Sequence, residues 1–344
     1  MSCFIIAEAG VNHGGQEDLA LALIDAAAEA GADAVKFQTF RAERLVVAGV
    51  EKAAYQRAQT GDGDQFSMLK SLELAPSIYA RLAQRCRDRN IEFLSTPFDP
   101  ESVDLLLGFG MNRLKVPSGE ITNVPFLRYL ASKDLPILMS TGMSTLAEVQ
   151  QAVEVIAAER ERHRFKGPLR EKLTVLHCTS NYPTEMRDAN LRAMVTLRNA
   201  LDLPVGFSDH TQGVVAAVAA VALGARVVEK HFTLDKSLPG PDHIASLTPI
   251  DLARMIADIR AVEQALGDGV KTPRPCELPV RDLVRRSVVL KRPLQEGQVV
   301  SRDDLTLLRP GTGISPKELP SVVGCRAARH LAEGHVLQWH DLAR

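Results

Sequence analysis

Eight short apolar runs recur along this chain, and polar residues able to do chemistry close or follow nearly every run. Such runs, alternating with helical patterns, predict parallel strands. When parallel strands close into a barrel, their carboxyl ends meet at one rim, and the active sites of TIM (β/α)8 barrels lie at that rim. The runs and their polar residues are 4–6 before Glu8, 34–37 with Lys36 and Gln38, 93–94 before Ser95 and Thr96, 113–114 before Lys115, Ser118 and Glu120, 137–139 before Ser140 and Thr141, 173–176 before His177 and Cys178, 204–207 before Ser208, Asp209 and His210, and 226–228 before Glu229 and His231.

Helical patterns separate these runs. Apolar residues recur at helical spacing from Leu19 to Ala30, and Gly31 then supplies a left-handed stop. Thr145 and Glu148 have capping-box spacing and predict a helix over residues 146–158. Eight such units favour a closed α/β barrel with right-handed crossovers. A doubly wound sheet is the alternative, but its Gly-rich dinucleotide fingerprint is missing.

The C-terminal part of the chain shows a different pattern. The 344 residues suit a barrel of about 250 residues followed by a smaller domain. Prolines in 271–275 exclude a helix interior there, and the segments 294–305 and 331–342 repeat one Glu-Gly pattern at a fixed offset. We therefore predict a TIM barrel over 1–268, a linker over 269–283 and a small β-rich domain over 284–344.

The connection 41–71 is too long for a simple βα turn. It is polar and contains glycine, and it follows the second predicted strand on the strand-end side. Long loops at that side usually shape or cover a site.

Charge and hydropathy exclude several classes of partner. The formal charge of -1 gives no reason to expect nucleic acid or an anionic membrane. There is no run of 18 apolar residues and no basic region before the first run, so we expect neither a membrane span nor a signal peptide. Five widely spaced cysteines without a CxxC indicate reduced thiols in a cytoplasm. Cys178 is read as a small buried residue rather than a catalytic thiol.

His210 and His231 end consecutive strands, which lie about 4.8 Å apart in a parallel barrel. Two neutral imidazoles at one rim suit a divalent Mn, Fe, Co or Zn ion. Glu229 and Asp209 are candidates to join them as ligands or to orient them. The alternative is a pair of hydrogen-bonded core histidines.

Lys36 and Lys115 end the second and fourth strands, and a lysine in a barrel mouth is costly unless it meets an anion. Hydroxyls and turn amides complete a cup that suits phosphate or carboxylate. Two alternatives stay open: an internal ion-pair network with Glu8 and Glu120, and a lysine Schiff base. The hydroxyl groups of the cup belong to Thr96, Ser118, Ser140, Thr141 and Ser208.

Glu8 and Glu120 have two possible roles. In a partly dry rim they act as general acid or base, or they serve as charge partners of the lysines. The residues alone thus indicate metal-assisted carbon–carbon or phosphate chemistry on a small anionic substrate.

Several ordered motifs then resemble the sialic acid synthases over nearly the whole chain. They are 6–13 (IAEAGVNH), 35–39 (VKFQT), 95–98 (STPF), 117–120 (PSGE), 140–143 (STGM), 207–211 (FSDHT), 229–233 (EKHFT) and 239–242 (PGPD). The segment 309–313 (RPGTG) resembles the antifreeze-like (SAF) domain of that family.

The resemblance implies a condensation of phosphoenolpyruvate with an N-acylated mannosamine-type sugar. It implies His210 and His231 as ligands of Mn or a similar divalent ion, such as Mg or Co, which polarises the sugar aldehyde. The enol carbon attacks that aldehyde, C2 takes up water and phosphate leaves.

The resemblance also implies roles for individual residues. Glu8, Glu120 and Lys115 match catalytic positions. Gln38, Tyr182 and Asp242 match positions on the sugar side. The positions that match phosphoenolpyruvate binding are Lys36, Thr96, Lys115, Ser118, Ser140 and Ser208.

The family is usually a domain-swapped dimer, in which Arg309 would reach the partner's barrel mouth and contact the sugar's N-acyl group.

Some positions depart from relatives and bear on the sugar. Ser180 stands where some relatives have asparagine, and 285–287 is polar where some have phenylalanine. N-acetylmannosamine is the first expectation, a 2,4-diacetamido-trideoxy sugar leading to legionaminate the second, and a pseudaminate precursor the third. The rival functions are a Schiff-base aldolase on Lys36 or Lys115 and a non-catalytic sugar-binding protein.

Overall fold

The computed structural model describes residues 2–343, and the chain divides into two compact units, Met1–Gly267 and Asp268–Arg344. The first unit contains eight parallel strands in the order β3-β2-β1-β8-β7-β6-β5-β4. β3 and β4, at the two ends of this order, contact each other, so the sheet is close to a closed barrel. The strands are β1 (Phe4–Gly10), β2 (Ala34–Thr39), β3 (Glu92–Pro97), β4 (Leu114–Val116), β5 (Ile137–Ser140), β6 (Leu173–Cys178), β7 (Val205–Asp209) and β8 (Val227–His231).

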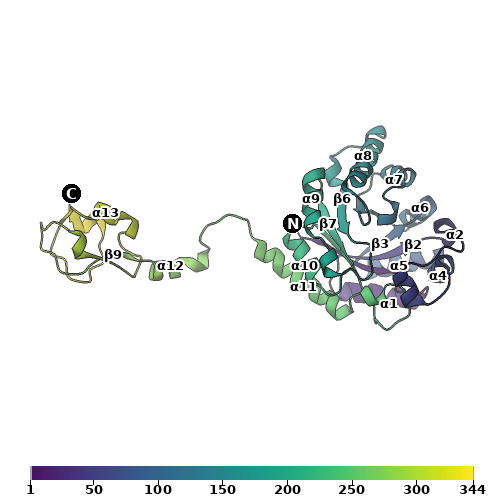
Figure 1. Ribbon diagram of the computed structural model, residues 1–344, viewed down its shortest axis with the longest axis horizontal. Helices are drawn as coiled ribbons and strands as arrows, with labels where there is room; N and C mark the ends of the chain where they lie inside the picture. The colour runs from purple at the N-terminus through teal and green to yellow at the C-terminus, as the bar shows by residue number, and fades with distance from the viewer. Residues whose placement is uncertain (1, 344) are drawn as a thin grey trace. The chain divides into compact units, whose positions relative to one another are not determined.

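Helices alternate with these strands and cover the outside of the barrel (Figure 1). This alternation confirms the predicted TIM barrel. The covering helices are α1 (Glu17–Glu29), α5 (Pro76–Asp88), α6 (Pro100–Gly108), α7 (Val124–Ala131), α8 (Leu146–Arg162), α9 (Arg192–Leu201), α10 (Val215–Ala222) and α11 (Pro249–Leu266). Short 3-10 helices lie at η1 (Ser118–Glu120), η2 (Leu169–Glu171), η3 (Met186–Asp188) and η4 (His243–Ala245).

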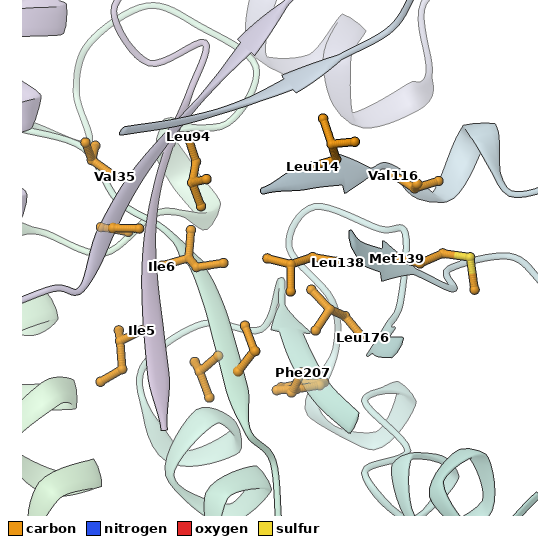
Figure 2. Packing of buried hydrophobic residues seen from close by; sticks show 14 of the residues in the cluster. Ile5, Ile6, Val35, Leu94, Leu114, Val116, Leu138, Met139, Leu176 and Phe207 are labelled. Atoms are coloured by element: carbon orange, nitrogen blue, oxygen red, sulfur yellow. The ribbon is translucent and has the colours of Figure 1, made fainter. Parts of the chain in front are cut away.

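The barrel interior is apolar. Figure 2 shows Ile6, Leu94, Leu138 and Leu176 gathered inside the ring of strands, and all four are buried. Side chains two residues apart share a face of a strand. The residues two positions further along β1, β3 and β5, for example Glu8, therefore also point inward, one layer nearer the carboxyl rim. The apolar layer is thus packed directly beneath these polar residues, which form the floor of the rim.

The sequence suggested a long loop over residues 41–71, but this connection is partly helical. It contains α2 (Ala42–Leu45), α3 (Ala54–Thr60) and α4 (Gln65–Leu72). Asp64 caps α4 by accepting a hydrogen bond from the Ser67 amide at 2.9 Å. Lys52 Nζ donates to the carbonyls of Gly61 and Asp62, both at 3.1 Å, just past the end of α3. Such short helices depend on these contacts, because helices of four to eight residues are unstable alone.

The second unit has its own small core, which includes Val288, Leu294 and Leu331. The two predicted repeats meet there, since Leu294 and Leu331 exchange two backbone hydrogen bonds of 2.9 Å. Gly297 and Gly334 occupy equivalent turns with φ of 76° and 77°. Its elements are η5 (Pro275–Glu277), α12 (Leu278–Val284), β9 (Ser287–Leu290), η6 (Arg302–Asp304), β10 (Leu305–Leu308), η7 (Pro316–Glu318), α13 (Leu319–Val322), β11 (Arg326–Ala327), η8 (Trp339–Asp341) and β12 (Leu342–Ala343), with β9–β10 and β11–β12 each paired antiparallel.

Across residues 2–343, no helix has the length and apolar character needed to cross a bilayer.

Candidate active site

A cavity of about 410 Å³ opens at the carboxyl rim of the barrel. All but two of the predicted site residues line it, so the topology brings together side chains from all eight strands or the loops that follow them. The predicted residues that line it are Glu8, Lys36, Gln38, Thr96, Lys115, Ser118, Ser140, Tyr182, Ser208, His210, His231 and Asp242.

Lys36 is the centre of the polar floor. Its Nζ lies 2.7 Å from Glu8 Oε2, donates to Thr96 Oγ1 at 2.9 Å and lies 3.7 Å from Glu229 Oε2. The lysine is buried, so these partners replace its lost water. The Lys36–Glu8 contact is one half of the ion-pair network that the sequence left open.

Lys115 is held differently. Its Nζ donates to Ser140 Oγ at 2.6 Å and lies 3.8 Å from Glu229 Oε1. Glu229 also accepts a hydrogen bond of 3.1 Å from Ser208 Oγ. Glu229, which the sequence offered as a metal ligand, therefore lies between the two lysines. Lys115 keeps a donor free for an anion.

The ionisation of the two glutamates diverges. Burial raises the pKa of Glu8 to about 7, partly offset by Lys36. Burial also raises the pKa of Glu229, but Lys115 and Lys36 outweigh that effect and its pKa is lowered. Two carboxyls with separated pKa values are the usual basis for one group that exchanges a proton and one that stays charged. Glu8 is therefore the candidate proton-transfer group.

A turn after β5 holds one of the cavity's hydroxyl side chains through a backbone amide. The Gly142 amide donates to Ser118 Oγ at 3.0 Å, and Cys178 Sγ lies 3.2 Å from the same hydroxyl. A Cβ on Gly142 would lie 2.2 Å from Ser180 Oγ. Glycine at this position lets three side chains converge. Cys178 is buried, as the sequence analysis expected.

His210 and His231 face each other with ring centroids 5.6 Å apart. His210 Nδ1 lies 2.7 Å from the Thr179 carbonyl oxygen. A carbonyl only accepts, so this nitrogen carries the proton and Nε2 keeps its lone pair. Burial lowers the pKa of His210 to about 4 and that of His231 well below its usual value, so both rings are neutral.

These two histidines fit a divalent metal. His231 Nδ1 is buried without a hydrogen-bond partner, and the nearest carboxylate oxygen, Asp242 Oδ2, is 3.9 Å away. Neutral imidazoles, one of them oriented through its other nitrogen, are the form that metals bind. Within residues 2–343, no group of three or more His, Cys, Asp or Glu side chains is arranged to hold a metal. The histidine pair is therefore the candidate set of protein donors.

Aromatic rings extend from the histidines toward α3. The Tyr182 ring lies 4.1 Å from His210 and 5.2 Å from Tyr55 of α3, centroid to centroid. Burial raises the pKa of Asp242, at the same side of the cavity, to about 6. The sugar-side residues implied by the resemblance therefore lie next to the histidine pair.

Two predicted residues lie outside this cavity. Glu120 accepts a hydrogen bond of 2.7 Å from Asn123 Nδ2 and does not line the cavity. Arg309 is exposed on the second unit. Asp209, a candidate ligand, is also elsewhere: its carboxylate is fully buried against Lys230 at 2.9 Å, on the opposite face of β7 from Ser208. The neighbouring residue in a strand points to the other face, which removes Asp209 from the ligand set.

The sequence analysis expected the connection 41–71 to shape or cover the site, and the cavity lining confirms this, but it did not predict the helices α3 and α4. Tyr55, Gln56, Gln65, Met68, Leu69 and Leu72 all line the cavity. The signal was present in the helical spacing of Met68, Leu69 and Leu72 after Asp64, a capping residue.

Comparison with known proteins adds a family context. Residues 23–271 match the model of the NeuB family, and residues 285–343 match that of the SAF domain. The chain is 50% identical over 343 residues to the N,N'-diacetyllegionaminic acid synthase of Legionella pneumophila, covering 99% of this chain and 95% of that protein. It is 44% identical over 335 residues to the synthase of the same name from Campylobacter jejuni, covering 97% and 98%.

A solved structure is also similar over most of the chain. The N-acetylneuraminic acid (sialic acid) synthetase from Leptospira borgpetersenii, crystallised with citrate, has 33% identity and a TM-score of 0.70. The match covers 81% of this chain and 90% of that one.

Proposed function

The chain belongs to the NeuB family, and we propose that it condenses phosphoenolpyruvate with 2,4-diacetamido-2,4,6-trideoxymannose to give N,N'-diacetyllegionaminate and phosphate. The family match confirms the resemblance to sialic acid synthases at the level of the family. The observation that carries the reaction type is one cavity that holds both a lysine pair and a histidine pair. The protein is a phosphoenolpyruvate-dependent condensing enzyme.

The sugar is chosen from the relatives. Two relatives at 50% and 44% identity, each covered nearly end to end, are named N,N'-diacetyllegionaminic acid synthases. This support reverses the order expected from sequence, and N-acetylmannosamine becomes the second candidate.

The lysine side of the cavity binds phosphoenolpyruvate in this proposal. Lys36, Lys115 and Ser140 supply charge-assisted donors to its phosphate and carboxylate. Thr96, Ser118 and Ser208 add hydroxyls around the same anion. Glu229 holds both ammonium groups within 4 Å, so the donors are oriented before the anion arrives.

Glu8 accepts the proton from the water that adds during the reaction and returns it in a later step. Bond formation joins C3 of phosphoenolpyruvate to C1 of the sugar, and the aldehyde oxygen takes up a proton and becomes a hydroxyl. Water adds at C2 and gives up a proton. The tetrahedral carbon then loses phosphate as its C–O bond breaks and the 2-keto group forms. A carboxyl with a pKa of about 7 accepts and returns protons efficiently near neutral pH.

His210 and His231 would hold a divalent ion, Mn first, with Mg or Co as alternatives. When bound, such an ion supplies a Lewis acid for the sugar's aldehyde oxygen. Thr179 fixes the proton of His210, and Tyr182 covers that ring, so the neutral form of the histidine is maintained.

Arg309 belongs to the proposal through the family resemblance. We assign it to the N-acyl group of the sugar bound in a partner chain, which requires a homodimer. Its conformation in the second unit is compatible with this role because the side chain is exposed.

The test is a phosphate-release assay with phosphoenolpyruvate and a panel of sugars in the presence of Mn. We expect the largest kcat/KM with 2,4-diacetamido-2,4,6-trideoxymannose and a smaller value with N-acetylmannosamine. A larger kcat/KM with N-acetylmannosamine would reverse the sugar assignment, and no phosphate release with any sugar would sink the reaction type.

One observation favours the Schiff-base alternative: burial lowers the pKa of Lys115, as in amine nucleophiles. That function predicts pyruvate trapped on a lysine by borohydride and activity that survives EDTA. The synthase predicts no trapped adduct and an EDTA-treated enzyme rescued by Mn.

A further inference from the structure

The cavity has two walls of opposite chemistry. The strand side is polar and charged, whereas α4 presents three apolar side chains to the same space, with Gln65 at its first residue. Gln65, Met68, Leu69 and Leu72 line the cavity at positions i, i+3, i+4 and i+7, which is one face of a helix. We call Met68, Leu69 and Leu72 the α4 wall.

The α4 wall is fixed to the barrel. Met68 and Leu72 are buried in a cluster with Val11 and Phe40, which is separate from the main barrel core. Glu73, just after α4, accepts hydrogen bonds from the Ala42 amide at 2.7 Å and from Arg41 at 2.9 Å. These contacts tie the end of α4 to the residues that follow β2, so the wall is a defined surface.

The aromatic rings that line the cavity indicate which part of the sugar would meet this wall. The histidine pair receives the aldehyde end of the sugar in the proposed function. From there, Tyr182 and Tyr55 form a continuous line of rings to α3, the helix before α4. A sugar with its aldehyde at the histidines and its body along these rings therefore directs its far end, C4 to C6, toward α3 and α4.

The far end of the proposed sugar differs from that of N-acetylmannosamine in two ways: an acetamido group replaces the hydroxyl on C4, and C6 is a methyl group without a hydroxyl. An apolar wall cannot pair a hydroxyl, and an unpaired buried hydroxyl is unfavourable. A methyl group instead gains contact with apolar side chains. On the basis of the proposed function, we infer that the α4 wall selects sugars whose C6 is a methyl group.

The experiment uses two matched pairs of sugars that differ only in the oxygen on C6. One pair is 2,4-diacetamido-2,4,6-trideoxymannose and its 6-hydroxy counterpart, and the other is 6-deoxy-N-acetylmannosamine and N-acetylmannosamine. For the pair that reacts, we expect kcat/KM to favour the 6-deoxy sugar about ten- to hundredfold, the range for one hydroxyl in an apolar pocket.

Leu72→Gln and Leu69→Gln test the α4 wall directly. Each should reduce the preference for the 6-deoxy sugar at least about fivefold, because the new amide gives a hydroxyl a partner. The KM for phosphoenolpyruvate should stay within about twofold, since the lysine side of the cavity is unaltered. Leu69 is only half-buried, so its variant remains informative where Leu72→Gln fails to fold.

Val47→Gln is the matched control. Val47 lies in the same connection, is 77% exposed and does not line the cavity, so the preference should not change. Equal kcat/KM values within the reacting pair overturn the inference, as does an unchanged preference in both leucine variants. Reaction of the N-acetylmannosamine pair alone overturns the proposed sugar, and the preference in that pair still decides the role of the α4 wall.

Discussion

Gly142 lies behind the cavity hydroxyl of Ser118, at a position without room for a side chain. The ideal Cβ position on this glycine is 2.2 Å from Ser180 Oγ and 2.9 Å from Ser118 Oγ. Ser118 belongs to the proposed phosphoenolpyruvate site, whereas Ser180 does not line the cavity. A methyl group there must displace Ser118, which accepts the Gly142 amide hydrogen bond.

We predict that Gly142→Ala lowers stability by about 1 to 3 kcal/mol, the usual cost of overpacking. It should also raise the KM for phosphoenolpyruvate. Adding Ser180→Ala removes the nearest clash and should recover part of both losses. Thermal unfolding and initial rates measure the two effects.

Gly108→Ala is the control for replacing a glycine by alanine where the new methyl group causes no clash. A Cβ there meets no atom within 4 Å, and the residue ends α6 without a positive φ. Its stability should be unchanged or slightly higher, because alanine limits the unfolded chain. Equal stability of Gly142→Ala and the wild type would contradict the steric argument.

The histidine pair gives a second prediction at this scale. His231→Ala should weaken Mn binding more than about tenfold, measured by calorimetry, and remove activity together with the metal. His163→Ala, which removes an exposed histidine after α8, should leave Mn binding unchanged. Full Mn affinity in His231→Ala would exclude that ring as a ligand.

Individual residues also show how far sequence reasoning reached. The strand-end rule correctly brought Lys36, Lys115 and His231 to one cavity, because alternation along a strand fixes the face of each side chain. It could not predict that Glu120 accepts from Asn123, since Glu120 lies in a 3-10 turn after β4 where no such alternation applies.

At the scale of elements, local signals predicted some helices well and others not at all. The capping box of Thr145 and Glu148 is present, with hydrogen bonds of 2.7 and 3.3 Å, and α8 starts where predicted. α4 has a local signal in its Asp64 cap and apolar spacing, but its place at the cavity depends on distant contacts, such as Glu73 with Arg41. Propensity carries no information about such contacts.

A buried ion pair links two elements behind the histidines. Lys230 of β8 and Asp209 of β7 are both fully buried, with Nζ 2.9 Å from Oδ2. Asp209 also accepts from the Thr211 amide at 2.8 Å, and Lys230 binds the Thr211 carbonyl. The pair therefore holds the turn that carries His210 against the strand that carries His231.

We predict that Lys230→Met lowers the free energy of unfolding by about 3 to 5 kcal/mol, since Asp209 is left buried and unpaired. The double variant Asp209→Asn, Lys230→Met should cost less than the sum of the two single changes. Urea unfolding followed by far-ultraviolet circular dichroism is the measurement, because the single tryptophan, Trp339, lies in the second unit.

Arg254→Met provides the comparison for an exposed pair. Arg254 and Asp258 on α11 are 3.8 Å apart and both largely exposed, so the loss should stay below about 1 kcal/mol. A loss for Lys230→Met as small as that for Arg254→Met would show that the buried pair contributes little to the barrel.

At the scale of the whole molecule, each unit has a separate apolar core. The sequence indicated the second unit through its repeat, since both copies carry the Glu-Gly turn and the later Asp-Leu pair. The repeat carries no information about the role proposed for Arg309, because that role depends on how two chains are arranged. That arrangement is the proposed homodimer.

Mixing two inactive variants tests that homodimer. His231→Ala damages the barrel site, and Arg309→Ala damages only the second unit's contribution. In a domain-swapped dimer containing one of each, the intact barrel receives Arg309 from its partner, and one of the two sites is complete. Because half of the randomly assembled dimers are mixed, refolding equal amounts together should restore about a quarter of wild-type activity.

His231→Ala mixed with Lys36→Ala is the matched control, since both changes lie in the barrel and no combination completes a site. If the first mixture shows only the summed activity of its components while gel filtration shows dimers, Arg309 acts within its own chain and the swapped arrangement is wrong.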